Sequence, residues 1–230
     1  MLQYRPTKLE CQLQNVIYWV MSLSTPKAPP RSLTRKGFAT RERIVSAAAE
    51  LIFQKGVAET TTQDVCDAAG VSFSQLYHYF DDKMKLVRAV IARQTETVLG
   101  AQQPFLGNLD SVSALRAWRD HLVAIQRHMG CEGGCPLGSL SSELSEKSPE
   151  ARAELATGFA RWEDGIRSGL RAMHERGELR ADADPDRLAL AMLATLQGAL
   201  ILTQVRRKTA PLEAALDAMI DYIESLTATS

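Results

Sequence analysis

The sequence predicts an all-α fold, in which an N-terminal three-helix domain containing a helix-turn-helix precedes a larger helical domain. Three observations support this prediction. From residue 40 onward, apolar residues recur every three or four positions over long stretches. Gly and Pro residues separate these stretches at intervals that suit helices of ordinary length. No stretch shows a sustained alternation of apolar and polar residues, so we predict no strands.

Length, charge and cysteine content narrow the class of protein. The 230 residues are 45% hydrophobic, enough for one large core or two modest ones. Residues 1–98 hold 13 Lys and Arg against 9 Asp and Glu, a net charge of +4, which residues 99–230 balance with −4. A basic first part fits a nucleic-acid-binding module joined to another domain. Four cysteines do not form a dense disulfide framework, and no apolar run approaches the ~20 residues of a membrane span. We therefore expect a cytoplasmic protein with no membrane partner.

The first 33 residues differ from the rest. Ser24 to Pro30 (STPKAPP) is a Pro-rich break that cannot be helical throughout, and we predict that residues 1–33 form a flexible arm. The alternative is a short amphipathic helix with apolar residues at Leu13, Val16, Ile17 and Val20.

The next three helices are predicted from their caps and apolar faces. Thr40 is a suitable cap for a first helix over Arg43–Lys55, and Gly56 ends it. Thr61 or Thr62 caps the second helix, Gly70 supplies a turn, and Ser72 caps the third. In this third helix Leu76 and Phe80 are spaced i, i+4 as core anchors, so Ser74, Gln75 and Tyr77 face outward.

The remaining helices follow from breaks and caps in the same way. Asp81 or Asp82 caps the fourth helix, Pro104 lies in the break after it, and Gly130–Gly138 separates the next two. Asp184 followed by Pro185 is a cap with proline at the first helical position. The expected helices are Lys83–Leu99, Val112–Met129, Ser139–Ser145, Pro149–Arg176, Asp186–Arg207 and Pro211–Leu226.

Residues 40–90 resemble the DNA-binding domain of the TetR (tetracycline-repressor-like) transcriptional regulators. The matching segments are IVSAAAELIFQKG (Ile44–Gly56), TTQDVCDAAGVS (Thr61–Ser72) and LYHYFDDKMKL (Leu76–Leu86), and Cys66 departs from the usual alanine. The resemblance implies that residues 34–84 bind DNA and residues 85–226 bind an effector and dimerise. The third helix would enter the major groove.

The DNA-binding residues come partly from this resemblance and partly from side-chain chemistry. Gln75 suits a bidentate contact with adenine, Ser74 and Tyr77 suit a phosphate or base edge, and Phe73 suits a thymine methyl group. Basic residues near the first helix would add attraction that weakens with salt. The predicted DNA-binding residues are Arg35, Lys36, Arg41, Thr62, Gln63, Ser72, Phe73, Ser74, Gln75, Tyr77, Tyr79 and Lys83. His78 is expected to be structural and to face the first helix.

The segment His128–Leu144 (HMGCEGGCPLGSLSSEL) resembles a G-C-x-x-G-S/N-L-x-x-E stretch found beside the effector pocket in one branch of the same family. Three interpretations are open. The cysteines are incidental and the glycines break a helix near a pocket; or Cys135 senses oxidants or electrophiles, with Cys131 as resolving thiol; or His128, Cys131 and Cys135 bind a metal. A helical enzyme that uses Cys135 is a more distant alternative, because no orienting residue or oxyanion motif accompanies it.

The larger domain is expected to hold a small, apolar effector. Residues such as Trp118 and Trp162 lie on helical faces that fit a core as well as a ligand cage. The residues predicted to line the effector pocket are Trp118, His121, Leu122, Cys135, Leu137, Leu140, Phe159, Trp162 and Leu196. We predict no catalytic residue, no cofactor and no resident metal, since residues such as Asp120, His174 and Glu143 are scattered on polar faces.

The last two helices carry near-heptad apolar stripes that have two interpretations: packing within one subunit, or a four-helix interface between two copies. The residues predicted for a dimer interface are Leu188, Met192, Leu196, Ala199, Leu212, Leu216, Met219 and Ile223. The expected function is therefore that of a homodimeric regulator, a repressor of a palindromic operator in double-stranded DNA that a small apolar effector releases.

Overall fold

The computed structural model describes residues 34–228, and the predicted arm over residues 1–33 lies outside this range. Contacts divide the chain into two units, residues 1–39 and 40–230, and the first contributes only residues 34–39 to the description. The described residues form nine α-helices, one short 3-10 helix and no strand. Their one isolated β-bridge joins Leu179 and Thr227. The all-α prediction is confirmed for this part of the chain.

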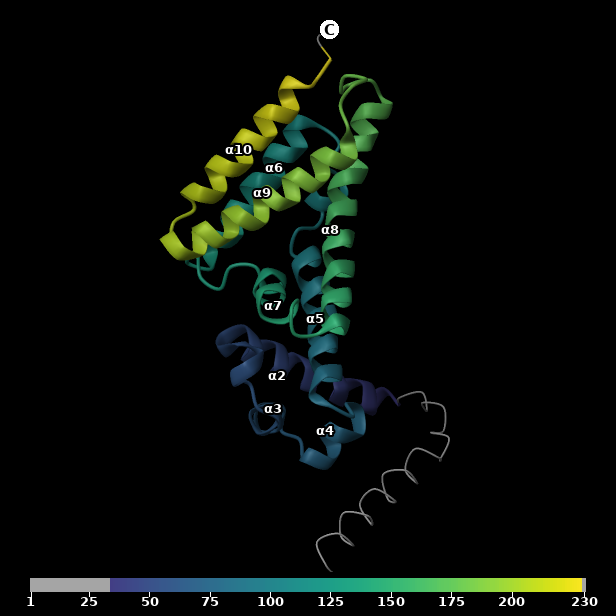
Figure 1. Ribbon diagram of the computed structural model, residues 1–230, viewed down its shortest axis with the longest axis vertical. Helices are drawn as coiled ribbons and strands as arrows, with labels where there is room; N and C mark the ends of the chain where they lie inside the picture. Colours follow the sequence, from purple (N-terminus) through teal and green to yellow (C-terminus); the bar gives the residue numbers. More distant parts are fainter. Residues whose placement is uncertain (1–33, 229–230) are drawn as a thin grey trace, which may run out of the picture. The chain divides into compact units, whose positions relative to one another are not determined.

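The helices and their bounds are α2 (Arg35–Glu59), α3 (Thr62–Ala69), α4 (Phe73–Tyr79), α5 (Lys83–Gly100), η1 (Phe105–Gly107), α6 (Val112–His128), α7 (Pro136–Leu144), α8 (Pro149–Glu175), α9 (Pro185–Arg206) and α10 (Ala210–Ser225) (Figure 1). The predicted caps are confirmed for four of them. The side chains of Thr61, Ser72, Asp82 and Asp184 each accept a hydrogen bond from a backbone N–H of the first turn of α3, α4, α5 and α9.

Two predicted helix starts are wrong. Helix α2 begins at Arg35, well before Arg43, and Thr34 precedes it and accepts from the N–H of Gly37 at 3.1 Å. Helix α7 begins at Pro136 rather than Ser139, because proline suits the first helical position and the Cys135 thiol accepts from the N–H of Gly138.

The residues that follow α4 form a bundle with a common core. Helix α8 packs on both α5 and α9, and α10 packs on both α9 and α6. Figure 1 shows α9 and α10 side by side, with α6 behind them. Large side chains from three of these helices, α5, α6 and α8, are fully buried: Ile91, Leu115, Trp118, Leu155, Trp162, Ile166, Leu170 and Met173. These buried faces are the ones that the helical spacing predicts.

Helix α9 is strongly apolar. Among the described helices, α9 alone is long enough and apolar enough to cross a bilayer, with a mean hydropathy of 1.8. The expectation that no apolar run approaches the length of a membrane span is therefore wrong for this helix. A core helix of a soluble protein meets the same criteria, and α9 packs on both α8 and α10.

Candidate nucleic-acid interface and internal cavity

Helix α4 is held at one face and exposed at the other. The segment before it is fixed locally: Gly70 takes a left-handed conformation (φ 60°) in the turn, and Ser72 and Gln75 form a reciprocal capping box. Leu76 and Phe80 are 2% and 3% exposed and anchor the helix on the core. The opposite face presents polar and aromatic groups to solvent, as a helix that enters a groove of DNA requires.

The outward face carries most of the side chains predicted to contact bases. Phe73 and Tyr77 are 43% and 48% exposed, and Ser74 and Gln75 are exposed beside them. The Gln75 carbonyl oxygen accepts from the backbone N–H of Ser72 at 2.9 Å. One lone pair of that oxygen is thus engaged in the helix cap, whereas a second lone pair and the NH₂ group remain for a base edge.

Two aromatic neighbours differ from the rest of this face. Tyr79 is half-buried against the core, so it has less surface to offer than Tyr77. The prediction that His78 faces the first helix is wrong. His78 is exposed, and its ring meets the Tyr79 ring edge-on with centroids 5.0 Å apart, because helix α4 is short and Leu76 and Phe80 are the side chains that point inward.

The predicted DNA-binding residues outside the Ser72–Tyr79 segment lie on α2, α3 and α5. Gln63 and Lys83 are exposed and Thr62 is half-buried. Gln63 donates to Asp67, and the Lys83 ammonium donates to the carbonyl of Val57 at 2.8 Å, which leaves two of its N–H groups for other acceptors. The remaining predicted basic residues lie in the first two turns of α2: Arg35, Lys36 and Arg41.

Arg41 is half-buried and has two partners. Its guanidinium lies 5.2 Å from the centre of the Phe80 ring and pairs with Glu42 at 3.2 Å. Arg35 and Lys36 are exposed. Because a more exposed charge reaches phosphates more easily, we expect the sequence-independent attraction to DNA to depend more on Arg35 and Lys36 than on Arg41.

An apolar cavity of about 180 Å³ lies between α5, α6 and α8, and the loop before α7, the first residue of α7 and one residue of α9 also line it. It opens to solvent on one side, where the exposed residues Thr97, Ala101 and Met129 lie. Its walls are largely aliphatic and aromatic, which suits a small organic ligand. The lining residues are Thr97, Val98, Ala101, Gln102, Leu122, Ile125, Gln126, Met129, Gly134, Cys135, Pro136, Trp162 and Leu200.

Three of the predicted effector residues, Leu122, Cys135 and Trp162, line this cavity, and the others do not. Trp118, Leu137 and Leu196 are buried in the core outside the cavity. The other three take different places. The half-buried His121 lies 2.7 Å from the carbonyl of Ala101 and stacks on Phe105. Phe159 is half-buried against the core, and Leu140 lines a second, smaller cavity.

Gln102 organises the two buried tryptophans. Its side-chain carbonyl oxygen accepts from the indole N–H of Trp118 at 3.0 Å and of Trp162 at 3.1 Å, and its NH₂ group donates to the carbonyl of Val98. Gln102 itself is 2% exposed. Sequence inspection misses it because it lies in a segment that the sequence predicts to be a break between helices.

The cysteine alternatives gain no support. Burial raises the pKa of the Cys135 thiol, which disfavours the reactive thiolate. Cys131 and Cys135 are both buried and free. Within residues 34–228, no group of three or more His, Cys, Asp or Glu side chains is placed to hold a metal ion, so the proposed set of His128, Cys131 and Cys135 is not assembled.

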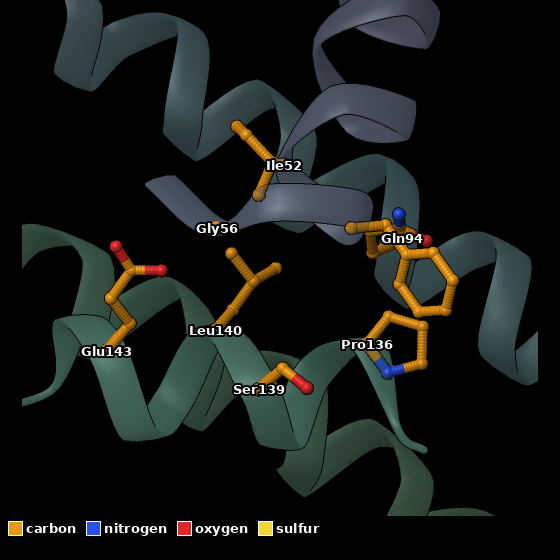
Figure 2. Close-up of a pocket in the computed structure, with 8 residues that line it drawn as sticks. Ile52, Gly56, Gln94, Pro136, Ser139, Leu140 and Glu143 are labelled. Atoms are coloured by element: carbon orange, nitrogen blue, oxygen red, sulfur yellow. The ribbon is translucent and has the colours of Figure 1, made fainter. Parts of the chain in front are cut away.

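Helix α7 connects the cavity region to the end of α2. At its C-terminal part, the Glu143 carboxylate accepts from the backbone N–H groups of Val57 and Ala58 at 2.8 and 2.7 Å. These amides follow Gly56, whose positive φ of 82° breaks α2 and is favourable for glycine. Figure 2 shows Glu143 and Leu140 of α7 facing Gly56 and Ile52 across a cavity of about 120 Å³.

The assignment of Glu143 to a scattered polar face is therefore wrong, because two backbone amides of another helix bind it. The preceding loop also touches α2. An added Cβ at Gly133 would lie 2.1 Å from the tip of the Phe53 ring, and Gly133 has a positive φ of 75°, a conformation that favours glycine. The G-C-x-x-G-S/N-L-x-x-E motif ends on Glu143, but it does not identify the partners of that residue.

The predicted dimer residues mostly pack inside the chain. Seven of the eight are buried and Met219 is partly buried, so packing within one subunit describes these side chains. The other face of the same two helices is apolar and exposed instead. Its large exposed side chains are Leu190, Ile201, Leu202 and Val205 of α9 and Tyr222 of α10.

A helix-turn-helix module with an exposed polar face, followed in the chain by a helical bundle with an apolar cavity, defines a DNA-binding regulator. Comparisons identify the family. Residues 44–90 match the model described as bacterial regulatory proteins, tetR family, and residues 111–219 match the tetracyclin repressor-like C-terminal domain. The chain belongs to the TetR family and is a DNA-binding transcriptional regulator.

Relatives of similar length support this assignment. The transcriptional repressor DhaR of a Mycobacterium species is 27% identical over 80% of this chain and 91% of its own. The transcriptional regulator AcuR of Cereibacter sphaeroides is 29% identical over 82% of this chain and 89% of its own. A crystal structure of a TetR transcriptional regulator from Chloroflexus aurantiacus is 29% identical, with a TM-score of 0.72 over 86% of this chain and 100% of that one.

Proposed function

We propose that this protein is a cytoplasmic, homodimeric repressor that a small, apolar effector releases from a palindromic operator. Residues 34–84 bind DNA, and residues 85–226 bind the effector and dimerise. The observation that carries the proposal is the face of α4 that presents Gln75 and Tyr77 while Leu76 and Phe80 are buried. The relative DhaR, which is named as a transcriptional repressor, supports repression rather than activation.

The exposed apolar face of α9 and α10 supports the dimer. Leu190, Ile201, Leu202 and Val205 recur at helical spacing, and Ala194 and Gly198 between them are small and exposed. Two copies that pack through these faces would form a four-helix interface. Such a dimer would place two α4 helices about one turn of DNA apart, ~34 Å, which suits an inverted repeat.

The path from effector to DNA is proposed to run through α7. Pro136 at its start lines both cavities, and Glu143 near its end binds the backbone at Val57 and Ala58. A ligand in the larger cavity that favours another position of Pro136 would also move Glu143. The effector shifts the equilibrium only by its difference in affinity for the two states.

Replacing Tyr77 by alanine tests the groove assignment. We expect operator affinity at fixed salt to fall about tenfold, because an exposed contact to a base edge or phosphate is lost. The melting temperature should stay unchanged, because Tyr77 is half-exposed. Tyr77→Phe separates the contribution of the hydroxyl from that of the ring. Equal affinity of wild type and Tyr77→Ala would contradict the assignment.

Replacing Glu143 by alanine tests the contact between α7 and α2. Two backbone N–H groups lose a charged acceptor, so we expect the free energy of unfolding to fall by about 1–3 kcal/mol. Amide hydrogen exchange at Val57 and Ala58 should accelerate. The control is Glu146→Ala, since Glu146 is exposed two residues beyond α7. An equal loss in both variants, measured by urea denaturation, would refute the role given to Glu143.

A further inference from the structure

Gln126 is a buried polar residue whose side-chain carbonyl oxygen is left unpaired by the rest of the protein. It lies on α6 and lines the larger cavity, and it is only 6% exposed. This oxygen has no hydrogen-bond partner among the described residues. A buried amide oxygen without a hydrogen-bond donor lowers the stability of the protein. Such an oxygen in the wall of a binding cavity therefore indicates that a ligand donates the missing hydrogen bond.

The other polar side chains of the cavity wall are less available. The Gln102 amide is occupied by two indole N–H groups and the carbonyl of Val98. The Cys135 thiol accepts from the N–H of Gly138, and Thr97 is exposed to solvent. Gln126 is therefore the polar side chain that a ligand inside this otherwise apolar wall would meet.

The lining contains no Lys, Arg, Asp or Glu. An ionised group of a ligand against this apolar wall would lose part of its hydration and gain no counter-charge, so the wall favours an uncharged ligand. The volume indicates the size of group that the cavity holds, because a cavity of about 150 Å³ binds benzene. At about 180 Å³ this cavity suits a six-membered ring with one or two small substituents.

We propose that Gln126 is the polar recognition residue of the effector cavity, and that the ligand is a small, uncharged ring compound with one hydroxyl group. A hydroxyl group both donates and accepts, so it satisfies either end of the Gln126 amide. The remainder of the ligand contacts Leu122, Ile125 and Trp162. This inference rests on the proposed effector-binding function and specifies its chemistry.

The test compares phenol, toluene and benzoate as probes by calorimetric titration of the full-length protein. Phenol and toluene have the same ring and nearly the same size, and differ in the hydroxyl group. In Gln126→Met we expect the affinity for phenol relative to toluene to fall about tenfold, as loss of one buried hydrogen bond predicts. Benzoate should not bind detectably to the wild type.

The control variant is Thr203→Val. Thr203 is fully buried, its hydroxyl also lacks a partner among the described residues, and it does not line the cavity, so its removal should leave the phenol-to-toluene ratio unchanged. The melting temperature without probe should not fall in Gln126→Met, because the carbonyl oxygen that it removes accepts no internal hydrogen bond. A lower melting temperature would mean a structural role instead.

An unchanged ratio in Gln126→Met, tighter binding of benzoate than of phenol, or no binding of phenol and toluene to the wild type would overturn the inference. Retention of DNA by the unliganded wild type is measured in parallel. If the wild type bound no DNA but the phenol-to-toluene ratio still fell in Gln126→Met, the proposed regulatory function would be refuted and the role of Gln126 in ligand binding would stand.

Discussion

Replacing Ile201 or Val205 by glutamate should yield a monomer that binds the operator at least ~100-fold more weakly. Both side chains are more than half exposed in the single chain, at 59% and 74%, on the apolar face of α9. In the proposed dimer each would meet its counterpart or a neighbour from the second copy. A buried carboxylate without a partner costs several kcal/mol per copy, which exceeds what a modest interface can offset.

The loss of operator affinity follows from the loss of tethering. In a dimer the second recognition helix binds its half-site as an intramolecular event, which raises affinity by about 10² to 10⁴. Light scattering after size exclusion measures the mass, and gel shift measures DNA binding. The control is Ala156→Glu on the exposed part of α8. If Ile201→Glu remains a dimer at micromolar concentration, the assigned interface is wrong.

Replacing Gln102 by leucine should cause the largest loss of stability among single substitutions near the cavity. The change leaves the indole N–H groups of Trp118 and Trp162 buried without an acceptor, and Trp118 is fully buried. Each unpaired donor costs about 1–3 kcal/mol, so the total of roughly 2–6 kcal/mol is a large part of a typical folding free energy.

Urea denaturation followed by tryptophan fluorescence measures this loss. Gln103→Leu is a matched control, because it makes the same chemical change one residue further along at an exposed position. We expect it to change the midpoint little. Similar midpoints for Gln102→Leu and Gln103→Leu would contradict the role of Gln102 as acceptor for both tryptophans.

Elements that depend on local signals are predictable from the sequence. Gly70 and Ser72 identify the turn and the cap of α4, and the spacing of Leu76 and Phe80 predicts which face is buried. The start of α2 is an exception. Thr40 offers a plausible cap inside the helix, whereas Thr34, whose side chain accepts from the first turn, lies close to the Pro-rich segment that weakens any helical signal.

Features that depend on tertiary packing are not predictable in the same way. The periodic stripes of α9 and α10 show that both helices have apolar faces, but α9 is apolar nearly all round. Periodicity therefore cannot separate the face that packs inside the chain, with Leu196, from the face that carries Ile201. Glu143 finds its partners 85 and 86 residues away along the chain, and no local pattern reports such a pairing.

The cavity shows the same limit. Leu122, Cys135 and Trp162 are predicted from apolar faces and from the cysteine motif, and they line it. Gln126 is absent from that prediction, although a polar residue four positions after Leu122 on an apolar helical face is a signal that sequence inspection can use.

Selection from a pool of randomised duplexes at fixed low salt asks whether α4 reads DNA through Gln75 and Tyr77. We expect the wild-type protein to enrich an inverted repeat whose half-sites lie about one helical turn apart. A Gln75→Ala, Tyr77→Ala double variant of normal stability should lose this enrichment. Enrichment of the same sequence by both proteins, or retention of no duplex by the wild type, would show that α4 is not the reading helix.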